Sequence, residues 1–238
     1  HGLCGCGGGL AGYTVFTAKF VHKIPEGLSY EKAALIEPIA VAVHSLRTGR
    51  FMTGQSALVL GAGPIGLATI EALKAAGASL VIVMQRKSVR QDYALRAGAD
   101  IVIDPNEVNV AEEVKRLTGG VGADISFETT GSKAGFDAGV ESIRHNGTMV
   151  VTSIWENEVS INPNTFIFSE KTIVGTIAYR NEFPATMALM NDGRIKAEGY
   201  ITKKISLDDI VKEGFGSLTG PDKKNHVKIL VTPDKSLL

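Results

Sequence analysis

The chain has 238 residues, enough for one large or two modest domains, and 44% of them are apolar, which is enough for a sizeable buried core. Lysine and arginine together number 25, as do aspartate and glutamate, so no net charge favours nucleic acid or an anionic membrane as a partner. No apolar run approaches the roughly 18 residues of a membrane span. The composition predicts a globular, cytoplasmic protein and leaves small neutral or anionic ligands open.

The first nine residues are rich in glycine and contain both cysteines, Cys4 and Cys6. Their spacing is too short for a comfortable disulfide, and two cysteines are too few for a disulfide framework, so a reducing cytoplasm is expected. A Cys-Gly-Cys metal site is the alternative, but structural zinc sites use four ligands in more widely spaced pairs, which favours a flexible loop. A glycine-rich start at His1 resembles the interior of a longer protein.

The next segment predicts one strand, one turn and two helical stretches. Tyr13–Thr17 is rich in β-branched and aromatic residues and predicts a strand, which the Ile24–Gly27 turn would follow. Ser29 is placed to cap a helix over 30–36, and Pro38 is expected to mark a break or a new helix start.

From Gln55 onward, short apolar runs alternate with amphipathic segments, which is the pattern of βαβ units. The predicted strands cover Ser56–Leu60, Leu80–Met84, Ile101–Ile103, Asp124–Phe127, Thr148–Thr152 and Thr172–Thr176. The predicted helices between the first five cover Gly63–Ala76, Val89–Ala97, Val110–Leu117 and Lys133–Ile143. The strand runs are mostly continuous and apolar, as in a parallel sheet buried on both faces. Right-handed crossovers then give an α/β fold, a doubly wound, six-stranded parallel Rossmann sheet.

A Gly-x-Gly-x-x-Gly pattern lies between the first predicted strand and the helix after it. Gly61 permits a tight turn, Gly63 lets the backbone approach a pyrophosphate, and Gly66 allows close packing of helix on strand. Pro64 and Ile65 begin the helix, whose N-terminal amides and dipole favour an anion. The pattern predicts a dinucleotide site, and a packing cluster in another α/β fold is the alternative.

The end of the second strand predicts which dinucleotide binds. An NAD site needs an acidic residue there to accept from the ribose 2′-hydroxyl, but Gln85 stands at that position. Arg86, with Arg90 near it, suits a 2′-phosphate, which a carboxylate would repel. The sequence therefore favours NADP over NAD, and a solvated basic helix start is the alternative.

The ends of the last three strands should complete the cleft, because ligands of such sheets bind at the carboxyl ends of the strands. The candidates are Thr129, Thr130, Gly131, Thr152, Ser153, Ile154, Thr176 and Ile177. Threonine and serine at strand ends are also common turn residues, and that alternative stays open at each position.

Four segments together resemble one enzyme family, the medium-chain zinc-dependent alcohol and polyol dehydrogenases, and most closely the 2,3-butanediol dehydrogenases. They are Ala34–Ala42, Gly61–Gly66, Phe127–Gly131 and Ile173–Tyr179, and the likeness extends over the whole chain. The resemblance implies a GroES-like catalytic domain joined to a Rossmann domain, and a homo-oligomer, either a dimer or a tetramer. It further implies a catalytic zinc and oxidation of a secondary alcohol by hydride transfer to the nicotinamide.

The resemblance assigns roles to two further residues. Glu37 matches the acidic position beside the catalytic zinc, as a ligand or as a partner of its bound water, and a surface carboxylate at a helix end is the alternative. Lys228 matches a position where a cation faces the cofactor pyrophosphate, although a solvated strand lysine is equally compatible. The family's other zinc ligands, a Cys and a His-Glu pair, are expected upstream of His1, so Glu37 is the one candidate ligand.

The resemblance predicts an N-terminally truncated member with three parts. Residues 1–44 would be a remnant of the GroES-like domain with a linking helix, 45–182 the Rossmann domain, and 183–238 a segment returning to the catalytic domain. The expected activity is NAD(P)-dependent oxidation of a vicinal diol or polyol such as 2,3-butanediol. A non-catalytic nucleotide-binding module and a zinc-independent quinone or enoyl reductase remain as alternatives.

Overall fold

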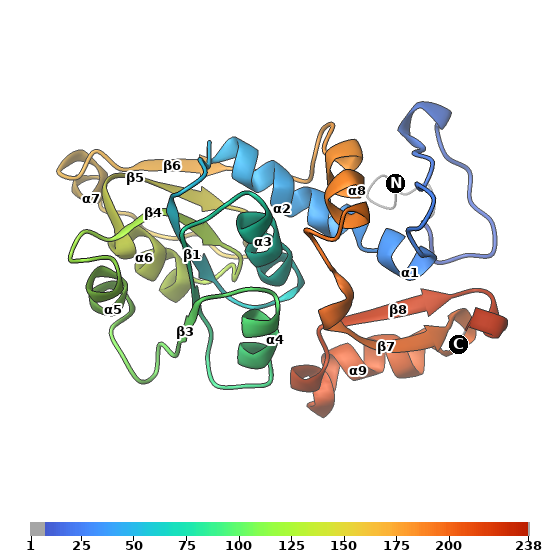
Figure 1. Ribbon diagram of the computed structural model, residues 1–238. Coiled ribbons are helices and arrows are strands. Elements are labelled where there is room, and N and C mark those ends of the chain that lie inside the picture. The colour runs from blue at the N-terminus through green and yellow to red at the C-terminus, as the bar shows by residue number, and fades with distance from the viewer. Residues whose placement is uncertain (1–7, 238) are drawn as a thin grey trace.

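The computed structural model describes residues 8–237, and a parallel α/β sheet dominates them (Figure 1). The six strands lie in the order β3-β2-β1-β4-β5-β6, which is the predicted doubly wound Rossmann topology. Their bounds are β1 Ser56–Leu60, β2 Leu80–Met84, β3 Ile101–Ile103, β4 Ala123–Glu128, β5 Ile143–Val151 and β6 Thr172–Gly175. The strand order reverses between β1 and β4, so the cleft expected in such a sheet opens beside β1.

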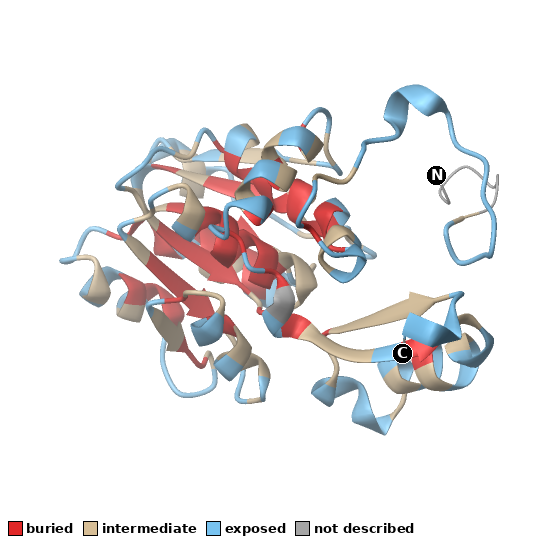
Figure 2. Ribbon diagram, turned by 45° about the vertical axis from the view of Figure 1, so that its right-hand side comes forward, coloured by how far each residue is buried: buried red, intermediate tan, exposed pale blue. Residues whose placement is uncertain are grey.

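Helices cover both faces of the sheet, and the alternation of side chains along β1 shows how. Ala57 and Val59 contribute to the larger core cluster, which includes residues of α2 and α3, whereas Leu58 and Leu60 pack with Val110 and Val114 of α5. The helices are α2 Ile36–Thr48, α3 Pro64–Ala75, α4 Arg90–Arg96, α5 Val110–Leu117, α6 Lys133–Ser142, α7 Asn164–Ile167 and α8 Phe183–Asn191. The buried residues concentrate in the sheet and in the helices packed on it, apart from α7, which has none (Figure 2).

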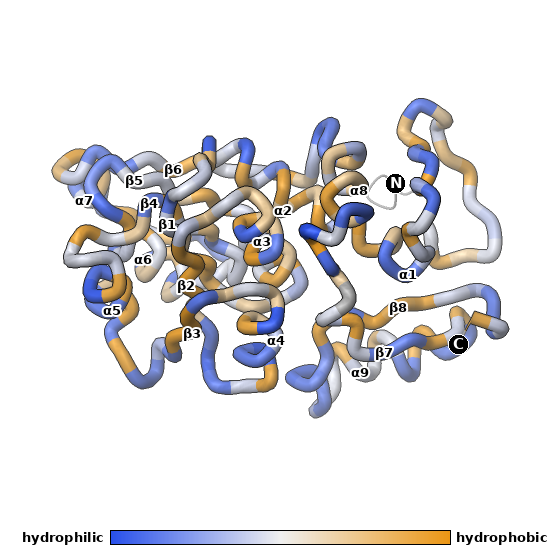
Figure 3. Tube along the Cα trace, viewed as in Figure 1, coloured by the Kyte–Doolittle hydropathy of each residue, from blue (hydrophilic) through white to orange (hydrophobic). Residues whose placement is uncertain are grey.

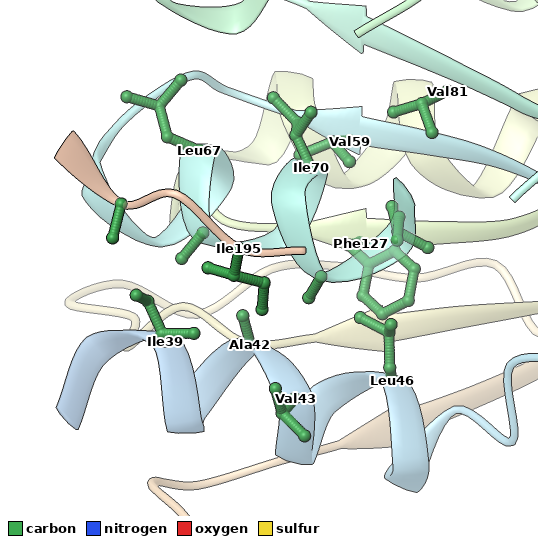
Figure 4. Packing of buried hydrophobic residues seen from close by; sticks show 14 of the residues in the cluster. Ile39, Ala42, Val43, Leu46, Val59, Leu67, Ile70, Val81, Phe127 and Ile195 are labelled. Atoms are coloured by element: carbon green, nitrogen blue, oxygen red, sulfur yellow. The ribbon is translucent and has the colours of Figure 1, made fainter. Parts of the chain in front are cut away.

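Helix α2 is a central part of the core. Ile39, Ala42, Val43 and Leu46 face the side of the sheet on which α3 also packs (Figure 4). Phe127 of β4 is fully buried in the same cluster, and its ring lies next to Leu46 of α2. Because Glu37 lies in the first turn of α2, this packing fixes the position of its backbone.

Three expectations from the sequence need correction. The predicted strand at Tyr13–Thr17 is wrong: these residues have no strand conformation in the structure and are all exposed, Tyr13 and Val15 by 99% and 90%, so their β-branched and aromatic side chains do not pack against a core. The helix α6 ends at Ser142, and Ile143 already begins β5, which starts five residues earlier than expected and contains a register shift opposite Ala123. The last two strands end at Val151 and Gly175, so Thr152 and Thr176 lie just beyond them.

The expected caps and breaks are otherwise found. Ser29 accepts a hydrogen bond from the backbone of Lys32 at 3.3 Å and caps the short helix α1, Tyr30–Ala33. The chain turns at Ala34 and Leu35, and Pro38 lies in the first turn of α2, where its missing amide hydrogen costs little. Cys4 and Cys6 lie outside the described residues.

The C-terminal part forms a second, smaller sheet. Its two parallel strands are β7 Ile201–Ser206 and β8 Lys228–Thr232, joined through the short helix α9, Gly216–Thr219. Hydrophobic residues run along β8 as they do along β2 and β3 (Figure 3). Within residues 8–237, no helix is long and apolar enough to cross a membrane.

Candidate functional site

The loop between β1 and α3 has the geometry of a phosphate cradle. Gly61 has φ +96°, a left-handed conformation that favours glycine. A Cβ on Gly66 would lie 2.0 Å from the Gly61 carbonyl oxygen, so α3 approaches the loop too closely for any side chain there. A Cβ on Gly63, by contrast, would meet no atom within 4 Å. The space at Gly63 is therefore open for a ligand rather than filled by packing.

A hollow of about 920 Å³ opens in front of this loop. Seven of the predicted cofactor-binding residues line this hollow: Gly61, Gly63, Gln85, Arg86, Arg90, Thr129 and Thr130. Other predicted residues do not line it: Glu37, Pro64, Ile65, Gly66, Gly131, Thr152, Ser153, Ile154, Thr176, Ile177 and Lys228. The hollow thus extends from the glycine loop toward the ends of β2 and β4.

Gln85 at the end of β2 is held against the glycine loop. Its Oε1 accepts a hydrogen bond from the backbone of Ala62 at 2.9 Å, and its Nε2 donates to the Arg86 carbonyl at 2.9 Å. The Arg86 side chain is exposed, and Arg90 is half-buried and donates weakly to the His226 carbonyl at 3.4 Å. Two guanidinium groups and no carboxylate therefore follow β2 on this rim.

Sequence reasoning missed the contribution of the end of β3. Asp104, 8% exposed, accepts from the backbones of Lys87 at 2.8 Å and of Asn106 at 2.9 Å, and so ties the loop after β2 to the loop after β3. Asn106 and Asn109 also line the hollow. The available signal was the position of Asp104 directly after a short apolar strand, since the same rule had selected the ends of β4, β5 and β6.

The ends of β4 and β5 lie side by side. The Thr129 hydroxyl donates to the Leu60 carbonyl at 2.7 Å, which closes the loop against β1. The Thr152 hydroxyl donates to Ser45 of α2 at 3.3 Å, and Ser153 donates to the buried carboxylate of Glu128. Glu128 was not among the predicted site residues, although it lies within one of the segments that carried the resemblance.

The end of β6 adds an apolar rim. Ile177 is 74% exposed, and Ile154, after β5, is 83% exposed. Ala178 has φ +49°, a conformation that costs a non-glycine residue free energy. The Thr176 hydroxyl oxygen is buried and has no hydrogen-bond partner among the described residues. A bound ligand could give the buried hydroxyl a hydrogen-bond partner and cover the exposed isoleucines at the strand ends.

Glu37 lies in the first turn of α2 with an exposed side chain. It lines a separate hollow of about 320 Å³, together with His22, Tyr30 and Phe183. Burial, and next the negative charge of Glu37, raise the pKa of Tyr179, whose ring packs 4.8 Å from that of Phe183. Within the described part of the chain, no three His, Cys, Asp or Glu side chains gather as a metal site. Glu37 by itself therefore does not make a zinc site.

An ionic cluster around the buried carboxylate of Glu182 lies farther along the same helix. Glu182, 4% exposed, accepts from His44 and Arg47 of α2 at 3.2 Å each and from the Arg180 backbone at 2.6 Å. Burial opposes ionisation of Glu182, but these hydrogen bonds outweigh it and lower its pKa. The cluster ties the segment between β6 and α8 to α2.

Lys228 begins β8, and its backbone carbonyl accepts from Thr202 at 3.1 Å. It stands two residues after His226, whose carbonyl Arg90 contacts. The C-terminal sheet thus approaches the cofactor hollow through Arg90.

The model of the family described as "Zinc-binding dehydrogenase" matches residues 64–192. The (R,R)-butanediol dehydrogenase of Bacillus subtilis is 43% identical over 234 residues, which are 98% of this chain and 66% of that protein. The crystal structure of 2R,3R-butanediol dehydrogenase from Bacillus subtilis superposes with a TM-score of 0.84 at 43% identity, covering 90% of this chain and 60% of that one. A putative zinc-binding dehydrogenase from Sinorhizobium meliloti, bound to NADP, gives a TM-score of 0.87 at 26% identity, covering 95% and 66%. The chain spans about two thirds of the length of the curated relative, and it belongs to the zinc-binding dehydrogenase family.

Proposed function

We propose that this chain binds NADP(H) and provides the cofactor-binding part of an oxidoreductase for secondary alcohols of the vicinal-diol or polyol class. The observation that carries the proposal is the open space at Gly63. Gly66, three residues later, is instead packed tightly against the backbone of Gly61. Family membership supports nicotinamide-dependent dehydrogenation, and the similarity to a butanediol dehydrogenase supports the substrate class. Residues 45–182 would be the dinucleotide-binding domain, and 1–44 and 183–238 the parts that join a catalytic domain.

The residues around the glycine loop suggest how the cofactor lies. The pyrophosphate would sit at the N-terminus of α3, where Gly63 leaves room and the free amides of the first helical turn can donate. The adenosine half would then extend toward Gln85 and Arg86, at the β2 side of the hollow. The nicotinamide half would cross to the ends of β4, β5 and β6, on the other side of the reversal in strand order.

NADP is proposed over NAD on this chain's own residues. Gln85, not a carboxylate, stands at the end of β2, and its oxygen already accepts from the Ala62 amide, so this position offers no charged acceptor for a ribose diol. Arg86 can instead pair with a 2′-phosphate in a forked geometry. The NADP bound to the Sinorhizobium relative supports the view that the fold accommodates that phosphate.

A bound nicotinamide would supply the acceptor for the hydride that an alcohol substrate loses on oxidation. The protein's part is positioning and exclusion of water. Ile154 and Ile177 would cover the nicotinamide, because they are exposed at the strand ends where that ring would lie. The Thr176 hydroxyl, buried without a partner among the described residues, would bind a polar group of the cofactor.

A catalytic zinc would need ligands beyond those that residues 8–237 bring together. Glu37 offers an oxygen donor beside a small hollow that His22 also lines, but the described residues bring no group of three His, Cys, Asp or Glu side chains together there. A zinc-assisted reaction of the whole protein is therefore proposed from the family alone, with Glu37 as one ligand and with the remaining ligands supplied by other groups.

We also propose a homo-oligomer that pairs through β6. This strand lies at the edge of the sheet, where an unpaired row of amides and carbonyls is open to another strand. A two-fold contact there would bury Ile173 and Val174, which are half-buried in one chain.

The experiment that tests the cofactor proposal is the double change Gln85→Glu with Arg86→Pro. The carboxylate would repel the 2′-phosphate, and the loss of Arg86 would remove its partner, so preference should move toward NAD by more than about tenfold, or about 1.4 kcal/mol. NADPH and NADH are titrated against wild type and variant at two salt concentrations, because an exposed phosphate contact is screened. Lys87→Ala, beside the changed residues, is the matched basic control. A wild type that already prefers NAD, with no change in the variant, would show that Arg86 is a solvated base.

A further inference from the structure

We propose that Glu128 is a positioning residue that shapes the nicotinamide half of the cofactor site, an inference that rests on the proposed function. Glu128 is the last residue of β4 and is fully buried. It lies opposite Leu60 of β1 and Val151 of β5 in the sheet. A carboxylate at the carboxyl end of a central strand therefore stands directly behind the cleft.

The two carboxylate oxygens of Glu128 bind the loops that follow β4 and β5, and the loop after β4 lines the hollow. Oε1 accepts from the Thr130 backbone at 2.7 Å, from the Thr130 hydroxyl at 2.5 Å and from the Gly131 backbone at 3.0 Å. Oε2 accepts from the Ser153 hydroxyl. The side chain thus joins the loop after β4 to the loop after β5.

The backbone of Glu128 also holds the loop after β5 close to the end of β4. Its carbonyl accepts from the amides of Thr152 at 3.0 Å and Ser153 at 3.2 Å. Gly131 has φ +63°, and a Cβ there would lie 3.0 Å from the Ile154 carbonyl oxygen. Since these two loops meet so closely, a shift of one would move the other.

The donors around Glu128 explain what the residue is for. In the described part of the chain, the carboxylate receives hydroxyl and amide hydrogens and forms no ion pair. A buried carboxylate without a cation is costly, so packing alone does not favour glutamate here. The geometry needs an acceptor at Oε1 and a hydrogen-bond partner for the Ser153 hydroxyl. A glutamine can supply both, because its oxygen can replace Oε1 and its amide can donate to the Ser153 oxygen, which then accepts instead of donating.

The experiment separates the two halves of the cofactor. NADPH and 2′,5′-ADP, which lacks the nicotinamide, are titrated against wild type, Glu128→Ala, Glu128→Gln and Ser153→Ala; NADH and AMP replace them if wild type prefers NAD. Glu128→Ala should weaken NADPH binding at least tenfold and change 2′,5′-ADP binding less than twofold. Glu128→Gln should restore NADPH binding to within about threefold of wild type, whereas a required charge would leave it as weak as the alanine variant.

Ser153→Ala keeps Glu128 and removes one donor, so it tests the proposal even if Glu128→Ala does not fold; it should weaken NADPH binding several-fold and spare 2′,5′-ADP. Ser126→Ala is the matched control, because Ser126 lies on the same strand and its hydroxyl donates to Gly139, away from these loops. The proposal is overturned if NADPH binding is unchanged in Ser153→Ala and in any folded Glu128→Ala, if both ligands weaken equally, or if glutamine does not restore binding. A wild type that binds neither ligand would instead overturn the proposed function.

Discussion

Two glycines three residues apart should respond to substitution in opposite ways. Gly63 has φ −78° and ψ −176°, an extended backbone that any residue adopts, and a Cβ there meets no atom within 4 Å. Gly63→Val should therefore leave the free energy of unfolding within about 0.5 kcal/mol of wild type. The same side chain would occupy the space of the pyrophosphate, so NADPH affinity should fall by about a hundredfold or more, or roughly 2.7 kcal/mol.

Gly66→Ala should act on stability instead. Its Cβ would lie 2.0 Å from the Gly61 oxygen and 3.0 Å from the Gly61 carbon, so α3 or the loop must move by about 1 Å to reach even the closest contacts that Cβ atoms make. Such overpacking should cost about 2–4 kcal/mol. Denaturant unfolding and nucleotide fluorescence titration are measured on the same preparations, with Gly12→Val as a control, since Gly12 also has open space around it.

Either of two results would refute these roles for the glycine loop. A Gly63→Val variant that binds NADPH as tightly as wild type would remove the loop from the cofactor site. A Gly66→Ala variant as stable as wild type would show that helix and loop are not packed as closely as the structure has them.

Three further predictions concern stability and assembly. Burial raises the pKa of Glu71 above its ordinary 4.5 despite hydrogen bonds from the C-terminal segment, so the folded state holds this proton more tightly than the unfolded chain. The contribution of Glu71 to the free energy of unfolding is therefore complete below pH 4.5 and is lost as the pH rises through the raised pKa. Glu71→Gln should flatten this decline when the free energy of unfolding is measured by denaturation across pH. An unchanged pH dependence in the variant would contradict the prediction. Phe127→Ala should cost about 3–5 kcal/mol of unfolding free energy in urea, because the fully buried ring leaves a cavity; a loss below about 1 kcal/mol would mean the core repacks freely. Sedimentation should show a dimer or tetramer for wild type and dissociation for Ile173→Lys at the β6 edge, and a wild-type monomer at micromolar concentration would count against that interface.

Elements with a strong local pattern could be predicted closely. The continuous apolar runs of β1, β2 and β3 are typical of strands buried on both faces of a parallel sheet, and their predicted bounds agree with the structure. Tyr13–Thr17 has the same composition, but a strand also requires a neighbour, and residue type alone does not reveal whether one exists. The end of β5 was predicted to within one residue and its start was not, because Arg144–Gly147 is polar and gives no strand pattern.

The residues of the candidate site show the same contrast between local sequence patterns and contacts that form only in the folded chain. Gly61 and Gly63 could be predicted because a short motif sets their geometry, and the structure places both on the hollow. Glu128 and Asp104 were missed because their importance comes from burial and from donors on other loops. Glu182 depends on partners about 135 positions away in the chain, which only the folded structure brings together.

The most direct test of dinucleotide binding is hydrogen–deuterium exchange of the 238-residue chain with and without saturating NADPH. We predict slower exchange of the amides in 61–67, at the start of α3, and in 128–132, beside Glu128, with little change in the C-terminal sheet strand Ile201–Ser206. Exchange that is unchanged in 61–67 under conditions where NADPH is bound would contradict the claim that this glycine loop holds the cofactor.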